Sequence, residues 1–201
     1  MQKSQRVKFY LVLTVFSLIG QVAWVVENMY FNVFIYKMFN ASASQISLMV
    51  SLSAVTATVT TLLIGAFSDK VGKRKVFICG GYIIWGITIL SFAFIRKDVI
   101  GALFPTVASA SSIGVSLVII MDCVMTFFGS TANDACFNAW LTESVSSQDR
   151  GKMEGINSMM PLVAILVVFG GFMSFNLEYA SSWTTIYVII GVVVVLIGIL
   201  G

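Results

Sequence analysis

Residues 65–75 read GAFSDKVGKRK, a short polar segment that separates two long apolar ones. The windows at about 46–67 and 76–95 on either side of it contain no charged residue. Each window exceeds the roughly 18 residues that an α-helix needs to cross the hydrocarbon core of a bilayer. The segment is therefore expected to be a tight loop between two transmembrane helices.

Four more apolar windows occur along the chain, at about 9–36, 113–142, 155–175 and 183–200. The composition agrees with this pattern, because 58% of the 201 residues are hydrophobic, only 10% are charged, and the mean hydropathy is +0.96. A soluble globule of this length would lack the polar surface needed to cover its core. We therefore expect an all-α membrane protein with six transmembrane helices in a single domain, residues 1–201, embedded in a lipid bilayer.

The sequence lacks the residues and motifs that several function classes require. The chain contains no histidine, and Cys79, Cys123 and Cys136 are widely spaced within apolar sequence. This pattern indicates neither a disulfide framework nor a metal cluster. The sequence also has no phosphate-binding glycine loop after a strand and no nucleophile motif. We expect no catalytic residue, no metal site and no cofactor, and hence not an enzyme.

Positive charge is distributed unevenly between the two sets of loops. If the amino terminus is cytoplasmic, nine basic residues lie on the cytoplasmic side and three on the other. The inner set is Lys3, Arg6, Lys8, Lys70, Lys73, Arg74, Lys75, Arg150 and Lys152, and the outer set is Lys37, Arg96 and Lys97. Such an asymmetry indicates a multi-pass protein of the cell membrane with a cytoplasmic amino terminus. The formal net charge of +3 then reflects orientation, so no nucleic-acid partner is expected.

The spacing inside the basic loop is more specific than positive charge alone requires. Gly65 is followed by Asp69, by Gly72 and then by three cations that start at Lys73. Gly72 permits a turn that other residues would strain. Asp69 is placed to accept from a helix amino terminus or to pair with Arg74.

This spacing resembles the signature loop of the major facilitator superfamily, Gly-x3-Asp-Lys/Arg-x-Gly-Arg-Arg/Lys-Lys/Arg, with Lys73 standing where arginine is commonest. A second match follows the fourth apolar window, where Glu143, Arg150 and Gly155 fit the Glu-x6-Arg-Gly-x3-Gly pattern of the corresponding loop, found in sugar transporters especially. The resemblance implies that the chain is one half of a twelve-helix carrier. A carboxy-terminal half is expected beyond Gly201, with pairing to a second copy of this half as the alternative.

The resemblance also implies a conformational role for these loops. In the family, the first loop joins the two halves of the carrier on the cytoplasmic side and helps to hold the outward-open state. Seven residues of this chain would form that gate: Gly65, Asp69, Gly72, Lys73, Arg74, Glu143 and Arg150. Glu143 is the candidate partner of Arg74, and Arg150 would complete the cluster. The alternative is a solvated interfacial ion pair worth about 0 to 1 kcal/mol.

Polar residues of the first window fall on one side of a helix. At 100° per residue, five of them lie within about 60° of one another: Thr14, Ser17, Gln21, Asn28 and Asn32. This face would line a water-filled cavity or the bundle interior, since it cannot face lipid without cost; the alternative is hydrogen bonding to neighbouring helices. Trp24 flanks the stripe and offers a flat face for a sugar ring. Glu27 lies more than a quarter turn away, towards a neighbouring helix or the outer vestibule.

The fourth window supplies a second polar group, Ser130, Asn133, Asp134 and Asn138. Asn133, Asp134 and Asn138 offer donors and acceptors suited to hydroxyl groups, and a desolvated carboxylate can titrate or bind a cation. Asp134 is therefore the main candidate for a coupling carboxylate, with Glu27 as a second. The alternative for Asp134 is a helix cap or an interhelical acid.

Residues 133–143 also resemble the equivalent part of the glycoside, pentoside and hexuronide cation symporters, in which an aspartate on the fourth helix takes part in binding. The second window departs from that pattern, because its polar residues are serines and threonines and include no carboxylate. Sodium coupling of that kind is therefore not implied.

Together, these features predict a secondary active transporter that moves a small polar solute, a sugar or related polyol, by alternating access coupled to a proton or a cation. The expected solute-binding residues are Gln21, Trp24, Asn28, Asn32, Ser130, Asn133, Asp134 and Asn138. Two alternatives stay open, a proton-coupled drug antiporter and a non-transporting membrane scaffold on the same fold.

Overall fold

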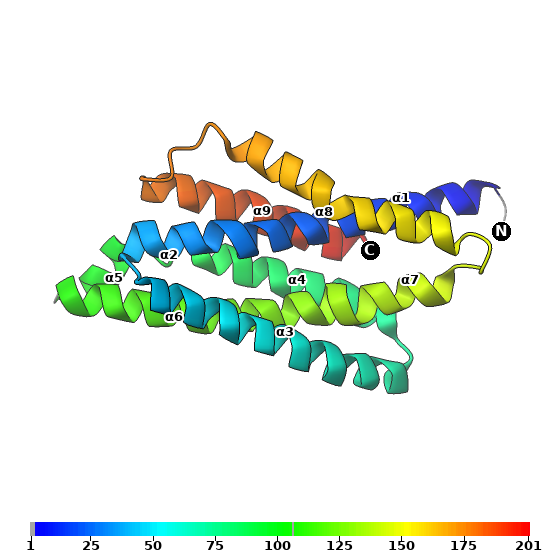
Figure 1. The fold of residues 1–201 in the computed structure, drawn as a ribbon, viewed down its shortest axis with the longest axis horizontal. Coiled ribbons are helices and arrows are strands. Elements are labelled where there is room, and N and C mark those ends of the chain that lie inside the picture. The colour runs from blue at the N-terminus through cyan, green and yellow to red at the C-terminus, as the bar shows by residue number, and fades with distance from the viewer. Residues whose placement is uncertain (1–2, 106) are drawn as a thin grey trace.

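The computed structural model describes residues 3–105 and 107–201, and in this part of the chain it contains helices and no strand (Figure 1). The elements in chain order are α1 (Lys3–Val25), η1 (Val26–Tyr30), α2 (Phe31–Phe39), α3 (Ala43–Val71), α4 (Arg74–Phe92), α5 (Lys97–Leu103), α6 (Val107–Gly129), η2 (Ser130–Phe137), α7 (Asn138–Ser144), α8 (Arg150–Phe172) and α9 (Ala180–Leu200). The segments η1 and η2 are π-helical and continue the α-helices on either side of them.

Six helical stretches are long and apolar enough to cross a membrane, which confirms the predicted all-α membrane fold. They are Val7–Phe39, Ala43–Val71, Arg74–Phe92, Ala110–Ser144, Arg150–Phe172 and Ala180–Leu200. Their ends differ from the apolar windows by a few residues, because capping residues rather than hydropathy determine where a helix begins and ends.

The six spans run back and forth along the long axis of the molecule (Figure 1). The start of α1, the α3–α4 turn and the α7–α8 loop lie at one end, and the α2–α3 and α8–α9 loops lie at the other (Figure 1). The loops with the larger set of basic residues therefore share one end of the bundle. The side chains of Lys3 and Arg6 lie outside the described residues.

Both ends of α3 carry the caps that their sequence favours. At the start, Ser42 Oγ accepts from the backbone N–H of Gln45 (3.3 Å), and Gln45 Oε1 accepts from the backbone N–H of Ser42 (2.8 Å). This reciprocal pair is a capping box. At the end, Gly72 adopts a left-handed conformation (φ 66°) and its N–H donates to the Ser68 carbonyl (2.9 Å). The predicted turn at Gly72 is thus a helix C-cap, and α4 starts two residues later at Arg74.

The two π-helical segments lie in the first and fourth spans, which are the longest, with 33 and 35 residues. Side-chain amides of Asn28 and Asn32 donate to the carbonyls of Trp24 and Asn28 (2.9 and 2.7 Å), and the amide of Asn138 donates to the carbonyl of Asp134 (3.4 Å). Side chains that occupy these carbonyls compete with the backbone N–H groups of a regular α-helix. The wider i→i+5 turns change the angular position of every later side chain.

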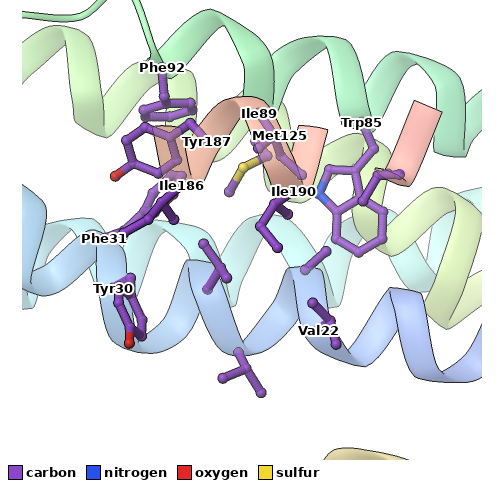
Figure 2. Close-up of a cluster of buried hydrophobic side chains, with 14 of the residues drawn as sticks. Val22, Tyr30, Phe31, Trp85, Ile89, Phe92, Met125, Ile186, Tyr187 and Ile190 are labelled. Carbon is purple, nitrogen blue, oxygen red and sulfur yellow. The ribbon is translucent and has the colours of Figure 1, made fainter. Parts of the chain in front are cut away.

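Aromatic side chains fill the interior between α2, α4 and α9, as Figure 2 shows for Phe31, Phe92 and Tyr187. The ring centroids of Phe31 and Phe92 are 4.4 Å apart, and those of Phe31 and Tyr187 are 5.2 Å apart. Lipid is as apolar as these rings, so close packing rather than the hydrophobic effect holds the helices together. The same core includes the fully buried Trp85, whose ring lies 5.3 Å from that of Trp24 and helps to fix it.

The backbones of α4 and α9 approach each other closely at three glycines, Gly86 of α4 and Gly191 and Gly198 of α9. A Cβ added to Gly86 would lie 2.7 Å from the backbone nitrogen of Val195 and 2.8 Å from the carbonyl oxygen of Gly191. Only a residue without a side chain fits there, as in other close helix contacts in membranes. At Gly80 of the same helix an added Cβ would meet nothing within 4 Å, so the requirement is confined to the contact.

The spans α3 and α8 bury the smallest share of their surface. Leucines such as Leu62 on α3 and Leu166 on α8 are mostly exposed. In a membrane, such apolar surface faces lipid or another transmembrane helix.

Candidate functional site

A cavity of about 420 Å³ lies between the first, second and fourth spans. Its volume is in the usual range of small-molecule sites, about 300–1,000 Å³. The lining residues are Gln21, Trp24, Glu27, Asn28, Asn32, Met49, Val50, Ser53, Ala54, Ala57, Asp122, Thr126 and Asp134. The span α3 contributes mainly small or apolar side chains, so the polar character of the cavity comes from the first and fourth spans.

Six of the residues predicted from the sequence meet at this cavity: Gln21, Trp24, Glu27, Asn28, Asn32 and Asp134. Much of the polar stripe of the first span therefore lines the cavity. Ser17, nearer the amino terminus, is buried instead against α8, where its hydroxyl donates to Asn157 Oδ1 (2.5 Å). The stripe combines the two expected uses of polar residues, since one part lines the cavity and another joins neighbouring helices.

Glu27 lines the same cavity, although the angular estimate from the sequence placed it more than a quarter turn from the stripe. The angular estimate assumed a straight α-helix, whereas Val26–Tyr30 is π-helical, which changes the angular positions of the side chains in this segment. The predicted contact with a neighbouring helix is present, since Glu27 Oε1 accepts from the Thr126 hydroxyl of α6 (2.6 Å). Glu27 is only 6% exposed, so its carboxylate does not reach an interface.

The group predicted around Ser130 is only partly assembled at the cavity. Ser130 is fully buried away from the lining, and Asn138 is exposed and bonds to the Asp134 carbonyl. Asn133 lies behind the cavity wall, where its Oδ1 accepts from the Tyr82 hydroxyl (3.1 Å) and its Nδ2 donates to Asp134 Oδ1 (3.1 Å). Of these residues only Asp134 lines the cavity, and Asn133 orients its carboxylate.

The sequence reasoning did not assign Asp122, Thr126 or Ser53 to the site. Asp122 and Thr126 do stand in a regular four-residue series with Ser130 and Asp134, which is a usable signal. On a straight α-helix that series drifts around the axis, but the π-helical segment η2 places Asp134 on the same cavity as Asp122 and Thr126. Ser53, whose hydroxyl donates to Asp122 Oδ2, has no sequence signal that separates it from the other hydroxyl residues of α3.

The cavity is acidic. Glu27, Asp122 and Asp134 all line it, and its described lining residues include no Lys or Arg. Glu27 lies within electrostatic range of the other two carboxylates. Among the described residues, no hydrogen-bond partner exists for the buried oxygens Glu27 Oε2, Asp122 Oδ1 and Asn32 Oδ1. An unpaired buried polar group costs about 1–3 kcal/mol, so the cavity is suited to bind a hydrogen-bond donor or a positive charge.

The basic loop forms a second polar cluster, which we call the Arg74 cluster and define as Arg74, Asp69, Glu143 and Ser68. Arg74 Nε and Nη2 donate to the two carboxylate oxygens of Glu143 (2.8 and 2.6 Å). Arg74 Nη2 also lies 2.6 Å from Asp69 Oδ1, and Nη1 donates to Ser68 Oγ (3.2 Å). The cluster thereby joins the end of α3, the start of α4 and the end of α7.

The other residues predicted for this cluster are placed less closely. Arg150 Nη2 donates to the Thr142 carbonyl (3.2 Å) and contacts neither acid of the Arg74 cluster. Lys73 is exposed in the turn, and Gly72 is the C-cap of α3. A Cβ at Gly65 would meet nothing within 4 Å, so the described residues give no packing reason for that glycine.

The opposite end of the bundle has its own ion pairs. Lys37 of α2 pairs with Glu178 of the α8–α9 loop. Arg96 donates to both oxygens of Asp98 (3.1 and 2.9 Å), and these hydrogen bonds lower the pKa of Asp98. Both pairs are largely exposed, so each adds little to stability.

The lining groups of the cavity are suited to bind a small polar molecule. Amide, hydroxyl and carboxylate groups can hydrogen-bond a polar solute, and the Trp24 ring offers an apolar face. Among the described residues, no group of three or more His, Cys, Asp and Glu is arranged to hold a metal ion.

Comparison with known proteins gives one further result. A family model described as Major Facilitator Superfamily matches residues 10–201. Neither the curated proteins nor the solved structures contain a match to the chain. The family match includes every residue that lines the cavity and both loops that contribute to the Arg74 cluster.

Proposed function

This chain belongs to the major facilitator superfamily, a family of membrane transporters, and on that premise we propose that it is a secondary active carrier for a small polar solute, a sugar or a related polyol. In this proposal the solute binds in the cavity, which opens alternately to the two sides of the membrane. Movement of the solute is coupled to movement of a proton or a cation.

The observation that carries the proposal is the polar wall of the cavity inside otherwise apolar spans. Gln21 and Asn28 supply amide groups, and the half-buried Asp134 supplies a carboxylate that Asn133 orients. Such groups pair well with hydroxyls, while an aromatic ring such as Trp24 packs on the C–H face of a sugar. The resemblance of residues 133–143 to the glycoside, pentoside and hexuronide cation symporters also supports a sugar.

We assign the cytoplasmic gate to the Arg74 cluster. Its two acids are well exposed, 59% for Asp69 and 61% for Glu143. Exposed ion pairs contribute only about 0–1 kcal/mol each. A contact that forms and breaks in every transport cycle must take little free energy to break, and these ion pairs meet that condition.

A second candidate function has one specific observation in its favour. The cavity has three carboxylates and no described basic lining residue, which would favour a cationic solute over a neutral one. Under this reading the protein is a proton-coupled antiporter that exports organic cations. A sugar carrier needs only one carboxylate for its solute, and the other two are then available for coupling.

Uptake measurements with the full protein in liposomes separate these functions. The probes are radiolabelled neutral sugars and radiolabelled organic cations, each with and without an imposed proton gradient. We expect accumulation of a neutral sugar that collapses with the gradient. Transport of the organic cations alone would support the antiporter. If folded protein transports neither sugars nor organic cations, the non-transporting membrane scaffold is the remaining function.

The variant Asp134→Asn tests the site itself. It preserves size and hydrogen bonding but removes the charge, so we expect loss of uphill accumulation with unchanged membrane insertion. Asp98→Asn is the matched control, because Asp98 is an exposed acid in the first turn of α5. Accumulation by Asp134→Asn at the level of the control would remove Asp134 from the mechanism.

A further inference from the structure

The third span lies behind the cavity without lining it. The described lining residues come from the first, second and fourth spans, and none belongs to α4. α4 packs closely on η2, so that a Cβ added to Gly81 would lie 2.7 Å from the Cβ of Ala132. Tyr82 and Asn133 are the next residues of the two helices, and the Tyr82 hydroxyl donates to Asn133 Oδ1 (3.1 Å). This contact brings a side chain of α4 to the residue that precedes Asp134.

The Tyr82 side chain is fixed on several sides. It is fully buried, and its ring centroid lies 5.2 Å from that of Phe16 and 5.6 Å from that of Trp85. The hydroxyl also donates to the backbone carbonyl of Phe16 on α1 (3.0 Å). Rings packed in this way have little freedom to change rotamer, so α1 and α4 together set the position of the hydroxyl.

Gly20 of α1 provides the space in which Tyr82 and Asn133 meet. A Cβ added there would lie 2.5 Å from the Tyr82 hydroxyl oxygen and closer still to Asn133 Oδ1. Both atoms would have to move before any larger residue could fit. Gly20 immediately precedes Gln21, which lines the cavity. The hydrogen bond therefore depends on a glycine at the edge of the polar stripe.

Asn133 links the Tyr82 hydroxyl to the cavity. Its side chain is 3% exposed, and while Oδ1 accepts from Tyr82, Nδ2 donates to Asp134 Oδ1 (3.1 Å). The acceptor and the donors of an amide are on different atoms. In the reverse orientation the amide oxygen would face the carboxylate, and two acceptors repel each other. The donor at one end and the acceptor at the other therefore select one orientation of Asn133, which holds the Asp134 carboxylate in place.

We propose that Tyr82 is a positioning residue for solute binding, which acts through Asn133 to hold the Asp134 carboxylate in the orientation that receives the solute. The inference rests on the proposed carrier function and adds a residue of the third span, which the solute does not touch. Without the Tyr82 hydroxyl, Asp134 keeps its charge and its place on the cavity wall. Its carboxylate must then be ordered when the solute binds, and that cost lowers solute affinity.

Initial rates of sugar uptake by the full protein in liposomes test the proposal. The probe is a radiolabelled neutral sugar that the unmodified protein accumulates, supplied over a range of concentrations so that KM and Vmax are measured separately. Tyr82→Phe keeps the ring and removes only the hydroxyl. We expect KM to rise about threefold to tenfold, the equivalent of one hydrogen bond, while Vmax stays within about twofold.

A purely structural role for Tyr82 predicts a different result, because loss of folded protein lowers Vmax and leaves KM unchanged. The matched control is Tyr187→Phe, which removes a hydroxyl from another fully buried tyrosine, in α9. No described group bonds to the Tyr187 hydroxyl, so the KM of this variant is expected to equal that of the unmodified protein. An unchanged KM in folded Tyr82→Phe would overturn the proposal and leave the carrier function intact.

The variant Asn133→Ala shows whether Tyr82 acts through Asn133. It removes the amide that connects the hydroxyl to Asp134, so we expect its KM to rise at least as far as that of Tyr82→Phe. Adding Tyr82→Phe to it should then change KM no further, because residues of one hydrogen-bond network do not contribute independently. KM increases that multiply in the double variant would show a separate action of Tyr82 and would also overturn the proposal.

Gly20→Ala disturbs the same contact without removing any of its groups, and it keeps the proposal testable if Tyr82→Phe fails to fold. The added methyl group displaces Tyr82 or Asn133, so KM is expected to rise as in Tyr82→Phe. Gly80→Ala is its control, since an added Cβ there meets nothing within 4 Å. Equal KM values for the two alanine variants would contradict the positioning role.

The unmodified protein separates this inference from the carrier function. Saturable sugar uptake by it supports the carrier whatever the variants show. If it takes up organic cations and no sugar, the sugar assignment fails, and the same variants are compared with an organic cation as the probe. If it takes up neither class, the carrier function is contradicted, and the positioning role falls with it.

Discussion

Arg74 connects three helices through one guanidinium group. Its side chain is 13% exposed, whereas the carboxylates of Asp69 and Glu143 that it binds are mostly exposed. Removal of the cation leaves no buried acid without a partner, so the loss of folding stability is small, about 1 kcal/mol. The same energy changes a two-state equilibrium about fivefold. The effect of this residue should therefore appear in the balance of transport states more than in folding.

Substitution Arg74→Gln tests this expectation. We expect about a fivefold shift towards the state in which the cytoplasmic end is open, measured by the rate at which a thiol reagent labels a cysteine placed at Ala57 in the cavity. Lys70→Gln is the matched control, because Lys70 is an exposed cation at the end of α3. Equal labelling rates in the two variants would mean that the Arg74 cluster does not hold the gate.

Some residue positions at the cavity and in the basic loop could be predicted from the sequence, and others could not. Gln21, Asn28 and Asn32 were placed at the cavity because three amides recur on one face of an apolar span, and the contact of Arg74 with Glu143 was implied by the resemblance of the two loops to the family's pattern. Asp122 was not assigned, because its position relative to Asp134 depends on a π-helical segment that hydropathy does not reveal.

At the scale of elements, the contact between α4 and α9 is the most demanding. Gly86 and Gly191 let the two backbones approach so closely that an added Cβ would meet backbone atoms within 3 Å. Backbone atoms cannot move aside as a flexible side chain can. The contact therefore depends on both glycines more strongly than helix propensity alone suggests.

Gly86→Ala should lower the stability of the protein by about 1–3 kcal/mol, the usual cost of overpacking. The control Gly80→Ala makes the same chemical change in the same helix, where the new methyl group meets nothing within 4 Å. We expect a lower midpoint of thermal unfolding in detergent for Gly86→Ala only. Equal midpoints for both variants would show that α4 and α9 can separate at little cost.

The number and approximate limits of the helices could be read from hydropathy, and caps explain where α3 begins and ends. Ser42 with Gln45, and Gly72 in its left-handed turn, are local signals of this kind. The π-helical segments are a different case. They coincide with Asn side chains that donate to backbone carbonyls, but serines and threonines such as Thr58 bond to i−4 carbonyls within regular α-helix as well. Local sequence therefore does not determine which of these sites widens into a π turn.

At the scale of the whole molecule, the uneven distribution of basic residues predicts how the bundle sits in the membrane. The α7–α8 loop lies at the end that carries the basic α3–α4 turn, and the α8–α9 loop lies at the other end (Figure 1). The positive-inside rule places the first of these ends in the cytoplasm.

Single cysteines at Ser147 and Ser174 test this orientation, because both positions are exposed in loops at opposite ends. The background is a variant whose three native cysteines are replaced by alanine. A membrane-impermeant maleimide applied to intact cells should label Ser174→Cys and leave Ser147→Cys unlabelled until the cells are opened. The reverse pattern would invert the assigned orientation, and with it the cytoplasmic location of the Arg74 cluster.

The most direct test of the account is water access to the cavity from each side of the membrane. A small hydrophilic thiol reagent is used to probe single cysteines placed at Gln21, Asn28, Asn32 and Asp134. Each cysteine is tested first in protein that keeps Arg74 and then in protein that carries Arg74→Gln. We predict that these positions react from one side at a time and that the gate variant changes the reactive side. If all four positions stay unreactive from both sides in folded protein, the cavity does not open and the protein is not a carrier.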